Sequence, residues 1–204
     1  MSYLNKEISK RSLKKAIRIG KAAAKLYYKK GYLETNMDHI ASATNMSKGG
    51  IYHYFSSKDE ILFFVLTNYM DIMLEDLDGE LAKIENSSLK IQFLIFRHIK
   101  LFINNLPEGK TLLHEAHCLP SKYYKKIAAK EKKYFQIVSG ILSEFFGGQI
   151  KIKNGRITVM TFLLFGMCNW VYSWYNPKGN ITPEELSEMI WMLYLQGIDR
   201  VPPK

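Results

Sequence analysis

The sequence is poor in cysteine and proline, and both shortages limit what the chain can be. Its 204 residues include two cysteines, Cys118 and Cys168, and six prolines, none of which falls within residues 1–106. The cysteine spacing fits neither a metal site nor a redox pair, so we interpret both as small core residues in a reducing compartment. Because proline and strand-like alternation are scarce, the chain is expected to fold as helices.

Long hydrophobic runs are also absent. The most apolar segment, residues 157–171, is too short and too interrupted to span a bilayer. Residues 1–15 lack the apolar stretch of a signal peptide. We therefore expect a cytoplasmic protein that has no membrane partner.

Groupings typical of enzymes are missing as well. No serine or cysteine has a convincing base partner, and no glycine-rich loop could hold a phosphate. His114 and His117, with Glu115 between them, form only a fragment of a metal-ligand pattern. The sequence therefore predicts neither an enzyme nor a bound metal or cofactor.

Basic residues are present in excess and are unevenly placed. The chain has 29 Lys and Arg against 19 Asp and Glu, a formal net charge of +10. Residues 1–60 hold 12 Lys and Arg against 5 Asp and Glu, so most of the excess lies in the first third of the chain. Such a surface could simply aid solubility, but it also suits a phosphate-rich partner.

Residues 35–60, TNMDHIASATNMSKGGIYHYFSSKDE, form the most informative segment. Thr35 is the predicted N-cap of a short helix, which Asn45 ends in a left-handed conformation. Ser47 is the predicted N-cap of a second helix, and Ser57 with Glu60 forms the cap of a third. Two short helices joined by a tight turn predict a helix-turn-helix, whose second helix enters a DNA major groove.

Side-chain chemistry indicates which positions would face DNA. The second helix has no Arg, Asn or Gln, which are common base-reading side chains, but Lys48 can bond to guanine. Tyr52 and His53 can contact base edges or phosphates, and Gly49 permits a close backbone approach. With so few base-reading groups, part of the specificity is expected to come from DNA shape. At the helix N-termini, phosphates would be met by Thr35, Ser47 and Lys58.

Apolar periodicity and turn signals divide the chain into about nine helices. The first is expected over residues 9–30, and a long fourth helix over residues 57–84. We predict an all-α fold with a three-helix helix-turn-helix domain, residues 1–56, followed by a larger helical bundle, residues 57–204. Helices of the bundle are expected over residues 89–104, 110–118, 121–146, 154–175 and 182–197.

Aromatic side chains are dense in the second half of the chain. They crowd residues 93–102, 123–145 and 162–175, with Met160 and Met167 nearby. For any single one of them, packing in a core or a dimer interface is the simpler interpretation. Taken together, large and flexible apolar side chains in a helical bundle also suit a ligand cavity.

The segment over residues 14–66 resembles the DNA-binding domain of the tetracycline-repressor (TetR) family of transcription regulators. The resemblance is carried by AAAKLYYKKGY and MDHIASATNMSKGGIYHYFSSKDEIL, and it departs from the commoner pattern at Gly50 and His53. It implies that the larger module binds a small inducer and that the last two helices pair with their copies in a homodimer. It also implies DNA contacts by Thr35, Lys48, Gly49, Tyr52, His53, Tyr54 and Lys58.

A second resemblance covers residues 166–186, GMCNWVYSWYNPKGNITPEEL. This stretch is similar to TetR-like regulators of fatty-acid catabolism, which respond to acyl-coenzyme A thioesters. Such a ligand would place its acyl chain inside the bundle and its phosphate-rich head near basic residues. Candidates for the head are Arg97, His98, Lys100 and Lys122, although a solvated surface is the simpler interpretation of each. The predicted ligand-binding residues are Phe93, Phe96, Arg97, Tyr123, Tyr134, Phe162, Phe165, Asn169, Trp170 and Trp174.

These observations predict a homodimeric, ligand-responsive transcription regulator. We expect a repressor that a small apolar ligand, such as a fatty acyl-CoA, releases from a palindromic operator. Its two recognition helices would lie about 34 Å apart, in successive major grooves, and the ligand would change this separation by shifting the fourth helix. The alternatives are a sensor of drugs or small aromatic compounds, a ligand-binding bundle without specific DNA binding, and an enzyme built in the aromatic cavity.

Overall fold

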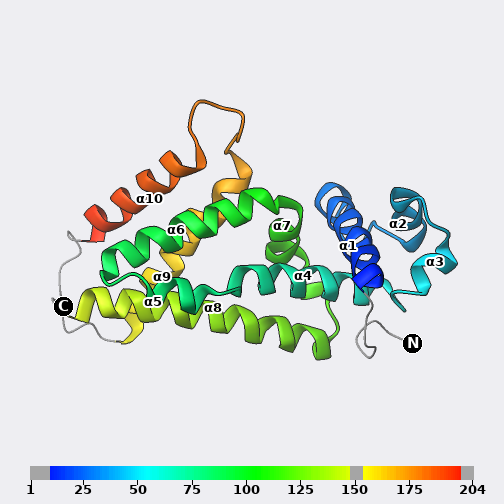
Figure 1. Ribbon diagram of the computed structural model, residues 1–204, viewed down its shortest axis with the longest axis horizontal. Helices are drawn as coiled ribbons and strands as arrows, with labels where there is room; N and C mark the ends of the chain where they lie inside the picture. The colour runs from blue at the N-terminus through cyan, green and yellow to red at the C-terminus, as the bar shows by residue number, and fades with distance from the viewer. Residues whose placement is uncertain (1–9, 148–153, 199–204) are drawn as a thin grey trace. The chain divides into compact units, whose positions relative to one another are not determined.

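A computed structural model describes residues 10–147 and 154–198, and every regular element within these ranges is a helix. This confirms the predicted all-α fold. The elements are α1 (Lys10–Lys30), α2 (Met37–Thr44), α3 (Lys48–Tyr52), α4 (Lys58–Leu74), α5 (Leu77–Ala82), α6 (Ser87–Asn104), α7 (Leu106–Glu115), the 3-10 helix η2 (Ala116–Cys118), α8 (Ser121–Gly147), α9 (Asn154–Asn169), the 3-10 helix η3 (Trp170–Ser173) and α10 (Pro183–Ile198) (Figure 1).

Residue contacts separate the chain into two compact units. The first contains the described residues up to Asp71 together with Asn105–Lys130, and the second contains Ile72–Asn104 together with the described residues from Glu131 onward. Helix α7 and the first part of α8 therefore belong to the unit that contains the helix-turn-helix. The predicted boundary after residue 56 concerns function, and it stays a prediction.

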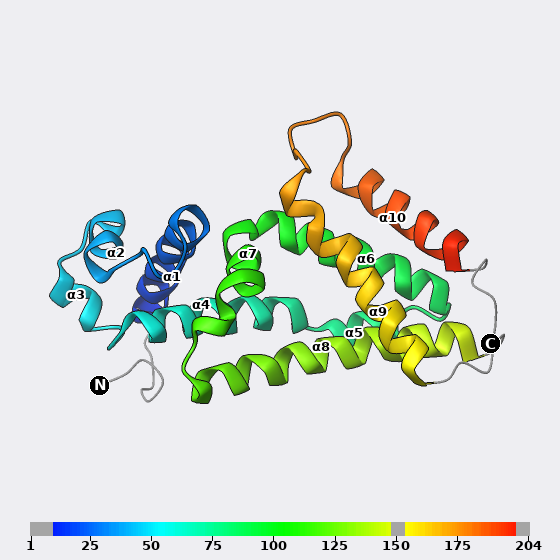
Figure 2. The ribbon, with the colours of Figure 1, turned by 180° about the vertical axis from the view of Figure 1, so that it is seen from behind.

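The first unit is built around the apolar face of α1. Ala16, Ile19 and Ala23 are fully buried and belong to one core cluster with Ile40 of α2 and Ile51 of α3. Figure 2 shows α2 and α3 following one another at one side of α1. Since all three helices share this core, α3 is held by its buried side while its other side stays at the surface.

Helix α4 ends sooner than predicted. Asp76 has a φ of 48°, in the left-handed region, and an α-helix cannot continue through such a residue. The single helix predicted over residues 57–84 is therefore wrong, because α4 and α5 are separate. The described residues thus contain ten α-helices, in agreement with the prediction of about nine.

Two further boundaries differ from the predictions. Helix α7 begins at Leu106, before the predicted start at residue 110, because Pro107 is in the first turn and proline is tolerated there. Helix α9 ends at Asn169, and the chain continues as η3 only to Ser173. The predicted helix over residues 154–175 is therefore two shorter elements that meet at Asn169.

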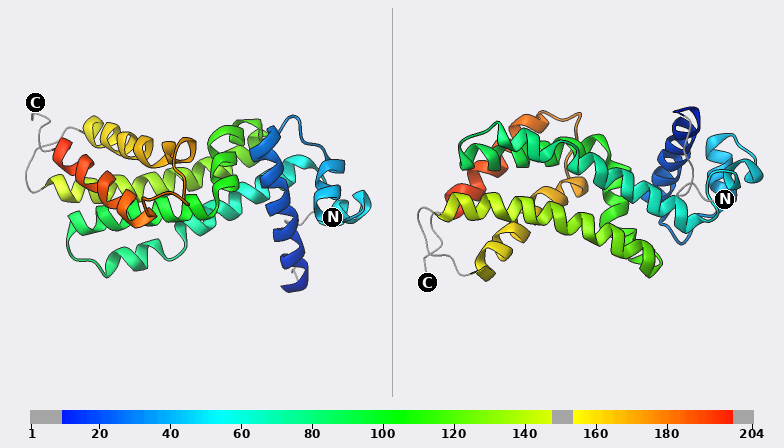
Figure 3. Two further views of the ribbon diagram at one scale, coloured as in Figure 1. Left: turned by 90° about the horizontal axis from the view of Figure 1, so that it is seen from above. Right: turned by 60° about the horizontal axis from the view of Figure 1, so that its bottom comes forward.

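Helix α6 is central to the second unit. It packs against both α9 and α10, and the left view of Figure 3 shows α10, in red, running across it. Its buried face includes Ile91, Ile95 and Ile99. Cys168 of α9 is buried as predicted, whereas Cys118, in the first unit, is partly exposed. Within the described ranges, no helix is long and apolar enough to cross a bilayer.

Candidate nucleic-acid interface and ligand site

Helix α3 is anchored by a cap and by buried residues at its far end. The Ser47 hydroxyl accepts a hydrogen bond from the Gly50 backbone N–H at 3.0 Å, which confirms the predicted N-cap. A Cβ at Gly50 would lie 3.2 Å from that hydroxyl, so the small residue leaves room for the cap. Ile51 and Phe55 are buried beneath the helix. This anchoring fixes which side of α3 faces outward.

The outward side of α3 carries most of the predicted DNA-facing residues. Ser47, Lys48, Gly49, Tyr52 and His53 are all exposed. A Cβ added at Gly49 would meet no atom within 4 Å, so another molecule could approach the backbone closely there. We define these five residues as the recognition face.

Lys48 makes an ion pair on this surface. Its Nζ lies 2.9 Å from Oδ2 of Asp38 on α2, which raises the pKa of Lys48 through a hydrogen bond and charge attraction. Both side chains are more than half exposed. An exposed pair of this kind is weak in water, so Lys48 can exchange the carboxylate for a base edge or a phosphate.

Two predicted DNA-contacting residues are buried instead. Thr35 has no exposed surface, and its hydroxyl donates to the Gly31 carbonyl at 2.9 Å. The N-cap of α2 is Asn36, which forms a capping box with His39, so the prediction of Thr35 as the cap was wrong by one residue. Tyr54 is also buried, with its ring edge against His53. We leave Thr35 and Tyr54 out of the recognition face because neither presents a side chain to a partner.

Lys58, at the start of α4, is used mainly within the first unit. Its Nζ donates to the carbonyls of Tyr32 at 2.8 Å and Leu33 at 3.4 Å, and it lies 4.1 Å from the centre of the Tyr32 ring. The Tyr32 hydroxyl in turn donates to Asp59. An ammonium has three N–H donors, so Lys58 can still donate one bond to a phosphate while it holds this turn.

A basic groove lies elsewhere on the same unit. It has a volume of about 550 Å³, with Ile17, Ala22 and Leu26 of α1 and Ala43 of α2 in its apolar part. The basic residues that line it, all exposed, are Arg18, Lys21, Lys25 and Lys29. The basic excess of the first third of the sequence is thus partly gathered on one side of α1.

In the second unit, three polar side chains meet in an apolar interior. His98 of α6 lies 3.0 Å from the Tyr134 hydroxyl of α8 through Nδ1, and 2.9 Å from Oδ1 of Asn169 through Nε2. An amide oxygen only accepts hydrogen bonds, so Nε2 donates to Asn169 and Nδ1 accepts from Tyr134. We call these three residues the polar cluster. It unites two predicted ligand-binding residues with His98.

Aromatic rings and a very small cavity adjoin the polar cluster. The Tyr134 and Phe165 rings stack with their centres 5.7 Å apart, and Phe102 stacks on His98 from another side. The cavity beside His98, Tyr134 and Phe165 has a volume of about 10 Å³, which is room for about one water molecule. An apolar ligand could enter here only if these side chains moved apart.

Burial should make His98 a source of acid sensitivity. Burial lowers the pKa of His98 from 6.5 to about 4. As the pH falls, the unfolded chain therefore binds a proton at this residue at a higher pH than the folded chain does. Stability is therefore expected to fall by about 3 kcal/mol as the pH drops from 6.5 to 4. Urea unfolding across this range should show a shallower loss for His98→Leu than for the parent chain. An unchanged slope in His98→Leu would contradict the assignment.

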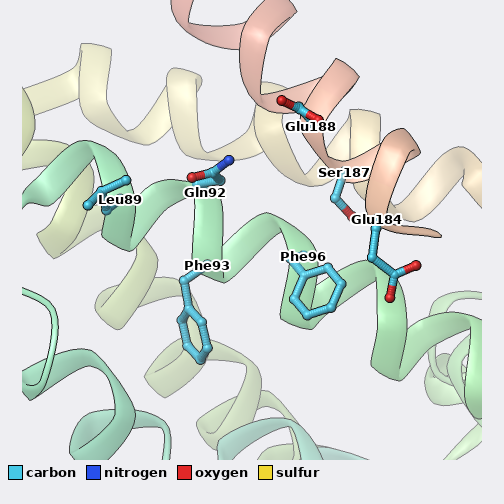
Figure 4. Close-up of a pocket in the computed structure, with 7 residues that line it drawn as sticks. All are labelled: Leu89, Gln92, Phe93, Phe96, Glu184, Ser187 and Glu188. Carbon is cyan, nitrogen blue, oxygen red and sulfur yellow. The ribbon is translucent and has the colours of Figure 1, made fainter. Parts of the chain in front are cut away.

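Phe93 and Phe96 line a different feature. Together with Leu89 and Gln92 of α6 and with Glu184, Ser187 and Glu188 of α10, they border an open groove of about 380 Å³ (Figure 4). Figure 4 shows the two rings on the α6 side and the carboxylates on the α10 side. Phe93 and Phe96 therefore line a different feature from Tyr134 and Phe165, and their contact with a ligand stays a prediction.

Arg97 is occupied by contacts within its own unit. Its Nε donates to Glu80 at 2.9 Å, and its terminal nitrogens donate to the carbonyls of Met73, Ile72 and Glu75 at 2.6, 3.3 and 2.7 Å. These carbonyls come from the end of α4, where no helical N–H is available to them. In this arrangement the guanidinium stabilises the break between α4 and α5, and the ligand contact of Arg97 stays a prediction.

Arg97→Met should therefore cost stability rather than ligand affinity. Loss of the guanidinium leaves several carbonyls and Glu80 unpartnered, so we expect the free energy of unfolding to fall by about 2–4 kcal/mol. Urea denaturation followed by circular dichroism would measure this change. Lys100→Met, at an exposed lysine one turn along α6, should change stability little. Unchanged stability with lost affinity for an acyl-CoA would restore the predicted ligand contact.

Four other predicted ligand-binding residues lie away from the polar cluster. Tyr123 belongs to the first unit, where its ring stacks on Phe63 at 4.5 Å. Phe162, Trp170 and Trp174 are exposed at the surface of α9, η3 and the segment after η3. The sequence has no periodic signal at the change from α9 to η3 that distinguishes a surface ring from a ring in a cavity, and the ligand contacts of these four residues stay predictions.

His98 is the residue whose importance the sequence least revealed. The sequence suggested it as a possible contact for a charged ligand head, whereas it is buried among rings. Its place in the apolar run FLIFRHIKLF was the available signal, because a histidine there must find partners inside the fold. Across the described residues, no group of three or more His, Cys, Asp or Glu side chains could hold a metal ion.

Comparison with known families decides what this arrangement is. The description "Bacterial regulatory proteins, tetR family" matches residues 19–64, and "Tetracyclin repressor-like, C-terminal domain" matches residues 86–198. The chain belongs to the TetR family. TetR-family regulators are DNA-binding transcription factors and not enzymes, and they bind operator DNA and dimerise.

Individual relatives agree with this assignment over most of their length. The repressor KstR2 of Rhodococcus jostii (strain RHA1) is 23% identical over 185 residues, which cover 86% of this chain and 87% of that protein. The fatty acid metabolism regulator protein of Bacillus subtilis (strain 168) is 25% identical over 186 residues, covering 90% and 95%.

Solved structures of TetR-family proteins have the same fold. A regulator from Bordetella parapertussis 12822 has a TM-score of 0.84 and 28% identity, with 92% of this chain and 98% of that chain covered. AibR in complex with isovaleryl coenzyme A and operator DNA has a TM-score of 0.77 and 30% identity, with 88% and 97% covered. The prediction of a ligand-responsive, DNA-binding transcription regulator is confirmed.

Proposed function

We propose that this TetR-family chain is a homodimeric repressor that an apolar acyl ligand, such as a fatty acyl-CoA, releases from a palindromic operator. The observation that carries the proposal is the recognition face, Ser47, Lys48, Gly49, Tyr52 and His53, held outward by the buried Ile51 and Phe55. Its lysine, tyrosine and histidine can donate to bases or phosphates, and none of the three is needed for the core.

The proposed dimer is formed by α9 and α10. Both helices expose apolar side chains that a single soluble chain has no reason to keep at its surface. On α9 and α10 these are Val159, Phe162, Leu163, Met189, Met192 and Leu193. Pairing with the same face of a second copy would bury them, as two-fold dimers do. Trp170 and Trp174, also exposed, would belong to the border of this interface rather than to a ligand cavity.

An acyl-CoA ligand is supported by the kind of protein this chain is similar to. The AibR structure contains isovaleryl coenzyme A, and one relative is a regulator of fatty acid metabolism. Within the second unit, Tyr134, Phe165 and Asn169 lie beside the small cavity. We place the acyl chain there, in a conformation in which the stacked rings of Tyr134 and Phe165 have separated.

A ligand-driven change has a covalent route to the DNA-binding helices. The division between the two units falls within α4, after Asp71. A shift at the C-terminal end of α4 would therefore change the position of its N-terminal end, next to α3 in the sequence. A coupling of about 1–3 kcal/mol between ligand and DNA is typical of such regulators.

A sensor of cationic aromatic compounds is the second candidate. The groove between α6 and α10 is lined by Phe93 and Phe96 and by Glu184 and Glu188 (Figure 4). Rings and carboxylates together suit a flat organic cation. Such a compound would bind without opening the interior.

One titration tests the proposal against this candidate. Fluorescence anisotropy would follow release of a labelled operator as decanoyl-CoA is added to the protein. Binding of the cationic dye ethidium to the protein would be measured in a separate assay without DNA. We expect decanoyl-CoA to weaken operator binding about tenfold or more, since a coupling near 1.4 kcal/mol gives a factor of ten. Binding of the dye without any effect of decanoyl-CoA would favour the second candidate.

A further inference from the structure

The small cavity in the second unit offers a ligand a place to form a hydrogen bond. Leu94, Ile95, Val138, Leu164 and Cys168 make up the apolar wall of the small cavity, and His98 and Tyr134 are its polar residues. Asn169 reaches the same histidine from the end of α9. A cavity of this kind binds by apolar contact and selects by its few polar groups.

The donor in this cluster is the Nε2–H of His98. It is directed at the Asn169 side-chain oxygen, while Nδ1 is satisfied by Tyr134. A ligand carbonyl could take the place of the Asn169 oxygen without leaving any of the histidine's groups unpaired. The exchange conserves the hydrogen bond, so it avoids the cost of an unsatisfied buried donor.

The charge of the residues around the cavity restricts which chemical group the ligand carbonyl can be part of. Among the described residues that line the cavity, none is lysine or arginine, and Arg97 is held by Glu80 and the end of α4. A carboxylate would be buried there without a counter-charge, which is strongly unfavourable. His98 could supply a positive counter-charge only by taking up a proton, and burial lowers its pKa to about 4. At pH 7 the protonated form of His98 is therefore disfavoured by about a thousandfold.

We infer that His98 is a specificity-determining residue, which donates a hydrogen bond to an uncharged carbonyl such as that of a thioester and excludes the corresponding free carboxylate. This inference rests on the proposed function, because it assigns the acyl part of the ligand to the interior of the second unit. Tyr134 positions the imidazole through Nδ1, Asn169 accepts from Nε2–H until the ligand carbonyl replaces it, and the apolar wall contacts the acyl chain.

The test uses two ligands that share one chain and lack the coenzyme A head. The thioester S-decanoyl-N-acetylcysteamine is uncharged, and decanoate carries a carboxylate at pH 7.5. Isothermal titration of the full-length protein should show the thioester binding at least about tenfold more tightly than decanoate. Equal binding, tighter binding of decanoate, or no binding of either compound would overturn the inference.

Variants separate a role in selection from a role in packing. His98→Leu cannot donate and should bind the thioester about tenfold more weakly, while His98→Gln, which can donate, should retain the preference. His117→Leu, the same change at an exposed histidine of the first unit, should bind like the parent chain. Circular dichroism would establish that each variant is folded, and Tyr134→Phe, which keeps the ring, gives a second variant expected to weaken thioester binding. Unchanged thioester affinity in folded His98→Leu would refute the role of His98.

The proposed function fails by a different measurement. If the thioester binds with the expected preference but the full chain never binds DNA in a sequence-dependent way, the regulator proposal fails and the role of His98 stands. If operator binding is specific and decanoate binds as well as the thioester, the repressor proposal stands and the role of His98 fails.

Discussion

Replacing Tyr52 with alanine should remove sequence-specific DNA binding and leave the fold intact. The Tyr52 side chain is 46% exposed and projects from the recognition face, so its loss creates no cavity. One base-edge contact is worth about 1–3 kcal/mol, and a dimer would lose it twice. We therefore expect the affinity for the operator to fall by about a hundredfold or more, as measured by fluorescence anisotropy at fixed salt.

The matched control is Tyr124→Ala. Tyr124, on α8 in the same unit, is 44% exposed, so the two variants lose the same side chain from equally exposed positions. Tyr124→Ala should bind the operator like the parent chain, and both variants should bind decanoyl-CoA equally. Similar operator affinities for the two tyrosine variants would remove Tyr52 from the interface.

Placing a charge on the apolar face of α9 and α10 should produce monomers. Leu193 and Phe162 are 63% and 62% exposed, so a glutamate at either position is compatible with folding of the single chain. Formation of the proposed dimer, however, would bury each inserted carboxylate. We expect the double variant Phe162→Glu, Leu193→Glu to sediment with the mass of one 23.7 kDa chain. Its operator affinity should fall about a thousandfold, toward non-specific binding, because each half-site is then bound alone.

Leu33→Glu controls for the effect of a charge on an exposed leucine. Leu33 is 76% exposed in the connection between α1 and α2. It belongs to the first unit, whereas the proposed dimer face belongs to the second. This variant should remain a dimer in analytical ultracentrifugation. If the Phe162, Leu193 double variant also remained a dimer, the two copies would have to pair through another surface.

Local chemistry made parts of this fold predictable from the sequence. The Ser47 cap, the left-handed Asn45 and the Thr182–Glu185 capping box each depend on residues within a few positions of one another. The same holds for the recognition face, since helical spacing and the apolar Ile51 and Phe55 determine which side of α3 is outward. The error of one residue at Thr35 arose because Thr35 and Asn36 are both good caps.

Contacts between distant residues were not predictable in this way. Arg97 satisfies carbonyls more than twenty positions earlier in the chain, and His98 meets Tyr134 and Asn169 from two other helices. Nothing in the spacing of these residues distinguishes a structural arginine from one that binds a ligand. The aromatic residues of α9 and η3 posed the same problem, because rings at a surface and rings in a cavity have the same sequence pattern.

Selection of duplexes from a random pool by the purified chain, followed by sequencing, tests the central claim most directly. If α3 is the DNA-reading element of a two-fold dimer, the selected DNA should contain an inverted repeat whose half-site centres are about one helical turn, or a whole number of turns, apart. The Tyr52→Ala protein should select no such repeat. Enrichment of a single unsymmetrical site, or no enrichment by the parent chain, would contradict the account.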